Sequence, residues 1–158
     1  AVMLPEGGGP LRQVAPLLPF FDIDPDQVQF LGTGLWDDPT LGNEPALVGG
    51  WFAAPAPEAA ARFHERFTAA YGYRPLRIAT LAYDAVALAA ALSRGAVPDF
   101  SRAAISSPSG FAGTDGIFRF LGNGIVDRGL VVIEVGEDGP TVIDPAPTTF
   151  QAPQAAVN

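Results

Sequence analysis

The hydrophobic residues fall into short runs that glycine- and proline-rich turns separate, and the runs alternate between strand-like and helix-like spacing. The apolar runs expected to form strands in the first third of the chain are 1–4, 28–33 and 46–53. Residues 11–21 have apolar positions at helical spacing, but Pro16 and Pro19 predict a short or kinked helix there. This succession of strands and helices predicts an α/β fold.

Two longer helices are expected in the middle of the chain. The segment Pro57–Tyr71 has Phe63 and Phe67 on one apolar stripe, and Gly72 follows it as a stop signal. The segment Leu76–Arg94 keeps the helical period and is apolar on several faces. It is therefore expected to be buried on several sides.

The last third of the chain returns to a strand-like pattern. Asp99 is expected to cap a short helix that ends at Ile105. Strands separated by Gly-Asn-Gly and Glu-Asp-Gly-Pro turns are then expected at 117–121, 130–135 and 141–143. Residues 151–158 are expected to form a loose tail.

Composition and charge exclude several classes of function. The chain has 158 residues, of which 48% are hydrophobic, and its 9 basic against 17 acidic side chains give a net charge of −8. This acidity opposes binding to phosphate backbones, so no nucleic-acid partner is expected. The sequence has no lysine and no cysteine, which excludes Schiff-base, P-loop and thiolate chemistry, and no cofactor is expected.

The sequence offers two weak candidates for a metal or catalytic site. Residues 22–26 begin like a calcium loop, but Gln27 and Thr33 stand where the turn glycine and the closing glutamate should be. We therefore favour a turn-forming acidic loop over a calcium site, and no metal is expected. His64 is the only histidine, and no serine lies in a Gly-x-Ser-x-Gly turn. A carboxylate-dependent hydrolase on an α/β scaffold stays open as an alternative, because sequence does not give the distances between carboxylates.

The loop Gly32-Thr-Gly-Leu-Trp-Asp37 is the most unusual segment. It begins like a dinucleotide-binding fingerprint, but Asp37 stands at the third glycine position and no helix is expected there. The loop follows the carboxyl end of an expected strand, which is where open α/β folds place ligands. Trp36 offers a flat apolar face for stacking on a ligand, or it folds onto the surface of its own domain. Trp51 and Phe52 are expected in the core.

Several segments occur in an order that resembles a known family. Over residues 1 to about 150 they are Val28-Gln-Phe-Leu-Gly-Thr, Leu47-Val-Gly-Gly-Trp-Phe, Tyr71-Gly-Tyr-Arg-Pro75, Ala82-Tyr-Asp-Ala-Val86, Gly110-Phe-Ala-Gly-Thr-Asp-Gly-Ile-Phe-Arg-Phe120 and Gly124-Ile-Val-Asp-Arg-Gly-Leu-Val-Val132. Together they resemble the C-terminal part of type I periplasmic binding proteins, the Venus-flytrap receptors related to Leu/Ile/Val-binding proteins of ABC transporters. The Gly-Thr-Gly-Leu-Trp-Asp loop and the Phe-Arg-Phe strand are most similar to the penicillin-binding-protein activator branch, whose outer-membrane lipoprotein member stimulates peptidoglycan synthesis.

This resemblance implies two α/β lobes built from discontinuous segments, with a ligand between them. Residues 1–50 and 118–150 would belong to the second lobe and 51–117 to the first, and the missing N-terminal half of the same protein would be a partner. The resemblance also implies a periplasmic location, with or without a lipid anchor, and no enzymatic activity. The protein would bind a small polar, amino-acid-like or peptide-like ligand for an ABC permease, or regulate a peptidoglycan synthase by protein contact.

The resemblance also implies particular ligand contacts. In amino-acid-binding relatives an acidic side chain in the loop after the 28–33 strand binds the ammonium group of the ligand. Gly34 stands at that position here, which argues against the usual mode of binding a free α-amino acid, and Asp37 or Asp38 is the expected substitute. The start of the Leu76–Arg94 helix faces the cleft in relatives. The residues expected to contact a ligand are Thr33, Trp36, Asp37, Arg77, Ile78 and Tyr83.

Overall fold

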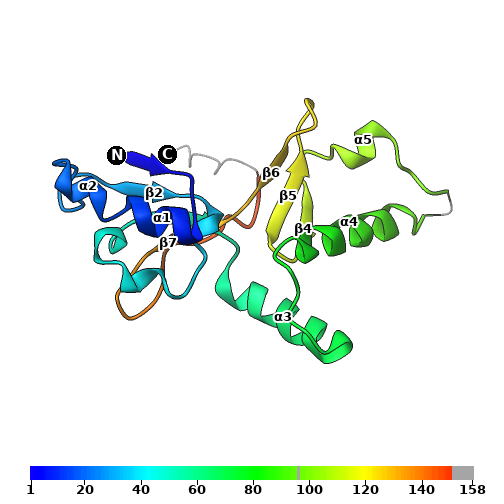
Figure 1. Ribbon diagram of the computed structural model, residues 1–158. Coiled ribbons are helices and arrows are strands. Elements are labelled where there is room, and N and C mark those ends of the chain that lie inside the picture. The colour runs from blue at the N-terminus through cyan, green and yellow to red at the C-terminus, as the bar shows by residue number, and fades with distance from the viewer. Residues whose placement is uncertain (96, 151–158) are drawn as a thin grey trace, which may run out of the picture. The chain divides into compact units, whose positions relative to one another are not determined.

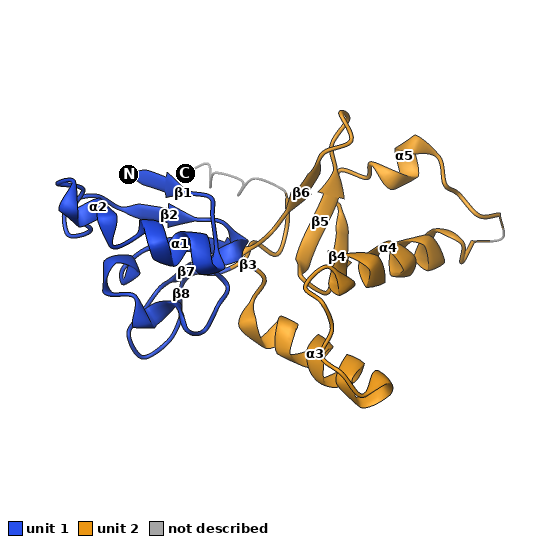
Figure 2. Ribbon diagram, in the orientation of Figure 1, with its two compact units in different colours: residues 1–54, 131–145 blue, residues 55–130, 146–158 orange. Residues whose placement is uncertain are grey.

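The computed structural model describes residues 1–95 and 97–150, which form two compact units (Figure 1). Unit 1 comprises residues 1–54 and 131–145. Unit 2 contains, of the described residues, 55–95, 97–130 and 146–150 (Figure 2). Both units are therefore assembled from two separate segments of the chain.

Unit 1 is built on a five-stranded sheet with the strand order β1-β2-β3-β7-β8. Its strands are β1 (Val2–Leu4), β2 (Phe30–Gly32), β3 (Trp51–Ala54), β7 (Val131–Glu134) and β8 (Thr141–Asp144). The strands β1, β2 and β3 are parallel, whereas β7 is antiparallel to both β3 and β8. Alternate residues of the central strands face the core, where Phe52, Ala54, Val131 and Ile133 are buried.

The connections of unit 1 are short helices and helical turns. They are α1 (Gly8–Val14) and α2 (Leu17–Phe20) after β1, and the 3₁₀ turns η1 (Gly34–Trp36), η2 (Leu41–Asn43) and η3 (Pro45–Leu47) after β2. The helix predicted at 11–21 is interrupted at Pro16, since proline has no backbone N–H to continue the helical hydrogen bonds. The prediction of a short or kinked helix is confirmed.

Unit 2 joins three helices to a three-stranded antiparallel sheet. The helices are α3 (Pro57–Tyr71), α4 (Ala79–Leu92) and α5 (Arg102–Ile105), and the strands, in sheet order, are β4 (Phe111–Gly113), β5 (Gly116–Phe120) and β6 (Val126–Arg128). Gly72 ends α3 in the left-handed conformation, with φ 77°, as its C-terminal stop.

Helix α4 contacts the sheet through polar side chains. The carboxylate of Asp84 is 4% exposed; it accepts hydrogen bonds from the N–H of Thr114 at 2.7 Å and from Arg128 Nη1 at 3.2 Å. One turn earlier, Thr80 Oγ1 donates to Asp115 Oδ2 at 2.5 Å. These bonds tie α4 to the turn between β4 and β5 and to β6.

The expectation that the 76–94 helix is buried on several sides is wrong for this structure. The buried residues of α4 are Thr80 and Asp84, whereas Leu81 and Val86 are exposed. One stripe of the helix faces the small sheet of unit 2, and Tyr83 packs on Phe63 of α3. Within the described residues, most of the remaining surface of α4 is exposed.

Three other expectations differ from the structure. The run at 46–53 forms a strand only from Trp51, and Trp51 is 38% exposed, because its indole lies outside the core and donates to Glu134 Oε2 at 2.9 Å. The cap of α5 is Ser101, whose Oγ accepts from the N–H of Ala104, and not Asp99. The strands β4 and β6 were not predicted. The tail expected at 151–158 lies outside the described residues.

The two units are divided differently from the expected lobes. Residues 118–130 lie in unit 2, because β5 pairs with β4 on one side and β6 on the other. Residues 51–54 lie in unit 1, because β3 pairs with β2 and β7. The assignment of the units to the lobes of a longer protein stays a prediction.

Candidate functional site

The carboxyl ends of the parallel strands β1 and β2 lie next to each other in unit 1 (Figure 1). Pro5 and Glu6 follow β1, and Thr33 follows β2. Thr33 Oγ1 donates to the carbonyl oxygen of Pro5 at 3.4 Å and accepts from the N–H of Leu35 at 3.2 Å. The Thr33 side chain thus links the two strand ends at the edge where open α/β folds bind ligands.

The Trp36 side chain is packed into the core of unit 1. Its side chain is buried, with 1% exposed, and its ring lies 6.4 Å from that of Phe52. A Cβ atom at Gly32 would fall 2.1 Å from the Trp36 ring, so glycine is required there. The indole Nε1 donates to the carbonyl oxygen of Glu6 at 3.1 Å. Trp36 therefore fixes the positions of both strand ends, and its contact with a ligand stays a prediction.

A small cavity of about 60 Å³ lies beside Trp36. It is lined by residues of the loop after β2 and of the turn after β7, including Asp37, Leu41, Val135 and Pro140. Sites for small organic ligands occupy roughly 300–1,000 Å³. This cavity is too small for such a ligand.

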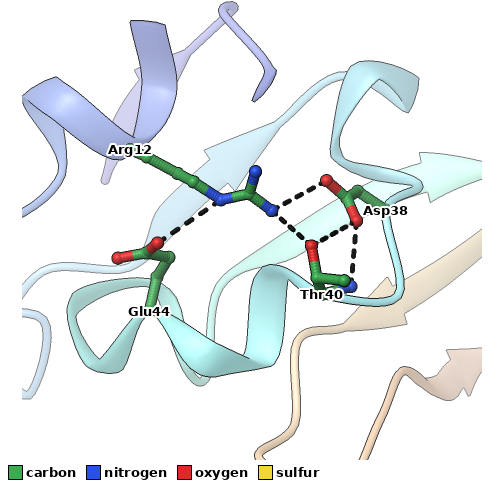
Figure 3. A network of polar contacts seen from close by, with 4 residues as sticks. All are labelled: Arg12, Asp38, Thr40 and Glu44. Carbon is green, nitrogen blue, oxygen red and sulfur yellow. Dashed lines mark hydrogen bonds and ion pairs between the residues drawn. The ribbon is translucent and has the colours of Figure 1, made fainter. Parts of the chain in front are cut away.

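Asp38 is held inside unit 1 by a polar network (Figure 3). Its Oδ1 accepts from the N–H of Thr40 at 2.9 Å and from Thr40 Oγ1 at 2.7 Å, and its Oδ2 accepts from Arg12 Nη2 at 2.9 Å. Arg12 also contacts Thr40 Oγ1 and pairs with Glu44 at 3.3 Å. The hydrogen bonds from Thr40, with the nearby Arg12 charge, lower the pKa of Asp38 below its ordinary value.

We expect the Thr40→Val variant to lose more stability at neutral pH than in acid. The lowered pKa of Asp38 in the folded state stabilises the fold above the ordinary carboxyl pKa, and this stabilisation disappears as the pH falls through the folded-state pKa. The variant should lose about 1 kcal/mol of unfolding free energy at pH 7. Urea unfolding between about pH 7 and pH 3 measures this; a loss that stays constant over that range, or one equalled by the exposed control Asp138→Asn, would contradict it.

Two carboxylates lie near the strand ends. Among the described residues, neither the Glu6 nor the Asp37 side chain has a hydrogen-bond or ion-pair partner, and both are exposed. The apolar side chain of Leu35 is also exposed and lies against Gly7. Of the two acids expected to substitute at Gly34, Asp38 is therefore occupied internally and Asp37 is not.

Sequence reasoning missed Glu6. The residue follows an apolar run and precedes three glycines. Its place near Thr33 depends on the pairing of β1 with β2, whose paired residues are 28 positions apart in the sequence. A signal was present in its position shortly after an apolar run, since open α/β folds bind ligands at the carboxyl ends of their strands.

The other expected ligand contacts lie in unit 2, where the chain enters α4. Ile78 is exposed and is the residue before the first turn of the helix, and Arg77 before it is exposed as well. Tyr83 is half covered, with its hydroxyl oxygen accepting from Arg66 Nη2 at 2.9 Å and its ring 5.6 Å from that of Phe63. Thr33, Trp36 and Asp37 thus form one group in unit 1, and Arg77, Ile78 and Tyr83 belong to unit 2.

Acidic residues and helix composition bear on the kind of site. In residues 1–95 and 97–150, no three histidine, aspartate or glutamate side chains gather closely enough to hold a metal ion. Asp24, in the loop that resembled a calcium site, accepts from the N–H of Asp26 at 2.9 Å as in an aspartate turn. No helix within the described ranges has the length and apolar composition that crossing a membrane requires.

Comparison with known proteins identifies the fold. No protein-family model and no curated protein sequence matches the chain. A solved structure described as a branched-chain amino acid ABC transporter from Rhodospirillum rubrum matches 90% of the chain, with 23% identity and a TM-score of 0.69. The leucine-binding protein LivK of Thermotoga maritima matches 89% with 21% identity and a TM-score of 0.54. Full-length LpoA of Haemophilus influenzae matches 91% with 14% identity and a TM-score of 0.59.

These likenesses show that the chain has the α/β fold of the type I periplasmic binding proteins, as the order of its segments predicted. The chain spans less than half of each of these proteins, with 44%, 42% and 26% of their lengths covered.

Proposed function

We propose that the chain is part of a non-enzymatic, bilobed periplasmic binding protein. The observation that carries the proposal is the edge at the carboxyl ends of β1 and β2, with two unpaired carboxylates beside an exposed leucine. The likeness to binding proteins supports it. The ligand would lie between this edge and a second lobe and would stabilise the closed arrangement of the lobes.

The chemistry of the edge favours a ligand with a cationic amino group and a small apolar part. Glu6 and Asp37 offer negative charge that no described residue neutralises, and Leu35 offers apolar contact. Thr33 and Trp36 would fix the ends of β1 and β2 through their hydrogen bonds to the carbonyl oxygens of Pro5 and Glu6. In unit 2, Arg77, Ile78 and Tyr83 are proposed as further ligand contacts. An amino-acid-like or peptide-like molecule combines these features.

Helix α4 supports the proposal that a further part of the same protein covers unit 2. Its buried residues are polar, whereas exposed apolar side chains occupy the helix and the segment before it: Leu76, Ile78, Leu81 and Val86. Such a face is unfavourable in water. In a bilobed protein more than twice as long as this chain, the missing N-terminal half would cover it.

The environment of the only histidine gives no support to a reaction in which that histidine acts as the general base. His64 lies on α3 with its ring 6.3 Å from Phe63. Among the residues that the structure describes, His64 has no hydrogen-bond partner that would orient it as a general base.

A second function has a specific observation in its favour. LpoA, an activator of a penicillin-binding protein, shares the fold over 91% of this chain. A domain of this kind can regulate a peptidoglycan synthase by protein contact, with or without a lipid anchor. Under this alternative, the edge at β1 and β2 would not be required to bind any small molecule.

A thermal-shift screen with matched ligand pairs tests the proposal. L-Leucine and 4-methylpentanoate differ only in the amino group, and D-alanyl-D-alanine and muropeptides extend the panel toward cell-wall ligands. A ligand at about 100 times its Kd adds about 2.7 kcal/mol, which raises Tm by several degrees. We expect a shift with an amine-bearing ligand and a smaller one with its amine-free partner.

Variants of the two carboxylates locate the binding site. Glu6→Gln and Asp37→Asn should each reduce the thermal shift, and the exposed Asp138→Asn in the turn after β7 should leave it unchanged. An amine-bearing ligand that shifts all variants equally would contradict the site. No shift with any ligand, together with measurable affinity for a peptidoglycan synthase, would favour the regulator.

A further inference from the structure

An open pocket of unit 2 lies between α5 and the turn that joins β5 to β6. Its volume is about 340 Å³. One wall consists of Arg102, Ile105 and Ser106, which belong to α5 and its C-terminal cap, and the other wall consists of residues 120–124. Unlike the small cavity of unit 1, this pocket has the volume of a site for a small organic ligand.

The two walls of the pocket are held by hydrogen bonds within unit 2. Ser101 caps α5 at its start through its Oγ atom. In the facing turn, the N–H of Ile125 donates to Asn123 Oδ1 at 3.0 Å. Arg102 Nη2 donates to the carbonyl oxygen of Gly122 and so ties α5 to the turn. These bonds keep the pocket in shape without a ligand.

The polar groups that remain available in the pocket are hydrogen-bond donors. A guanidinium has five N–H groups. In the described part of the chain, the Arg102 guanidinium bonds to one carbonyl oxygen and pairs with no carboxylate. Neither the Ser106 hydroxyl nor the amide nitrogen of Asn123 has a partner there. None of the residues that line the pocket is acidic, so this set of donors suits an anion.

The remaining lining of the pocket is apolar. Ile105 and Phe120 are half buried, and Leu121 is exposed. The Phe120 ring is held edge-to-face on buried Phe118, at a ring distance of 6.0 Å. An inorganic anion would leave this apolar surface in contact with water, whereas the apolar body of an organic acid would cover it.

The charges of the two units also favour an anion in unit 2. In the sequence, unit 1 has one arginine and eleven acidic residues. Unit 2 has eight arginines against six acidic residues, which gives it a net charge of +2. The summed charge of unit 1 repels an anion, and that of unit 2 attracts one.

We propose that the pocket between α5 and the β5–β6 turn is a second ligand site and binds a small organic acid, a monocarboxylate with an apolar body. The carboxylate accepts hydrogen bonds from the free N–H groups of Arg102, with the Ser106 hydroxyl and the Asn123 amide as further donors. The apolar body packs on Ile105 and Phe120. The site shares no residue with the ligand edge of unit 1, so either site can be absent without the other.

An amide NMR titration of the intact protein with 3-phenylpropanoate tests the proposal. We expect a Kd of about 0.1–1 mM, because the ligand is small and Arg102 is exposed. The amide signals of residues 105–106 and 121–124 should shift to saturation, whereas those of Glu6 and Asp37 should not. Uncharged 3-phenylpropanamide, and inorganic phosphate, which has no apolar body, should each bind at least five times more weakly.

Variants of two donors locate the carboxylate. Arg102→Gln should weaken 3-phenylpropanoate binding about fivefold to tenfold, because it removes the charge. The exposed Arg94→Gln makes the same change in charge in unit 2 and should leave binding unchanged. Ser106→Ala should weaken binding about twofold to threefold, and the exposed Ser109→Ala should not.

The Asn123→Asp variant separates ligand recognition from a structural effect. It keeps an oxygen that accepts from the N–H of Ile125, but it replaces the free donor by an anionic oxygen. The Tm should stay the same, binding of 3-phenylpropanoate should weaken at least tenfold, and binding of 3-phenylpropanamide should change little. A structural effect would weaken the binding of both compounds equally.

Several results would overturn the proposal. One is the absence of saturable shifts at residues 105–106 and 121–124 with up to about 10 mM 3-phenylpropanoate. Another is equal affinity for the acid and its amide, or for the acid and phosphate. Variants of Arg102 and Ser106 that bind as well as their controls would also contradict it, and so would an equal loss of both compounds in Asn123→Asp.

Discussion

The Asp84→Ala variant is expected to lose about 3–5 kcal/mol of unfolding free energy, enough to unfold unit 2 in a marginally stable protein. The carboxylate is buried, and it accepts hydrogen bonds from Thr114 and Arg128. Its removal leaves the guanidinium of Arg128, which is only 17% exposed, without its counter-ion in a poorly solvated position. Urea unfolding followed by circular dichroism measures the loss.

Two controls separate loss of this ion pair from a general effect of mutation. The exposed Asp138→Ala should change stability by less than about 0.5 kcal/mol. Replacing both partners, with Asp84→Leu and Arg128→Met together, should recover much of the loss, because no charge is then left buried and unpaired. A double variant as unstable as the sum of its single variants would contradict this explanation.

The Trp36→Ala variant is expected to be destabilised by about 3–5 kcal/mol, since it removes a large side chain that is fully enclosed in unit 1. It also leaves the carbonyl oxygen of Glu6 without its hydrogen-bond donor. The two strand ends at the ligand edge would then lose their common support, so the same variant should also weaken ligand binding. Thermal unfolding and ligand titration measure the two effects.

The second tryptophan provides a matched control. Trp51→Ala removes an indole that is 38% exposed and should cost less than half as much stability. Trp36→Phe keeps most of the ring but not the N–H group, and should cost about 1–2 kcal/mol. Equal losses from Trp36→Ala and Trp51→Ala would show that Trp36 does not support the edge.

The periodicity of the sequence predicted most elements but not how they pack. The helix expected at 76–94 is present as α4, yet its buried stripe is polar. The partners that make this stripe favourable, Thr114 and Arg128, lie 30 and 44 residues away from Asp84 along the chain. The short strands β4 and β6 were missed for the same reason, because their three residues become strands only by pairing with β5.

The candidate site was predictable to a similar extent. The loop after β2 could be recognised, since it directly follows an apolar run and contains unusual residues. The internal use of Asp38 could not, because Arg12 lies 26 residues earlier in the sequence. Whether Trp36 faces a ligand or the core depends on the space left by Gly32 and Gly50, which only the folded sheet defines.

Calorimetric titration of the intact protein, followed by mass spectrometry of the recovered ligand, tests the central claim most directly. The titrant is the amine-bearing ligand with the largest thermal shift. We expect saturable one-to-one binding that Glu6→Gln and Asp37→Asn weaken, with the ligand recovered at unchanged mass. Binding that neither variant affects, no saturable heat, or recovery of a hydrolysed product would contradict a non-enzymatic binding protein whose site lies at the ends of β1 and β2.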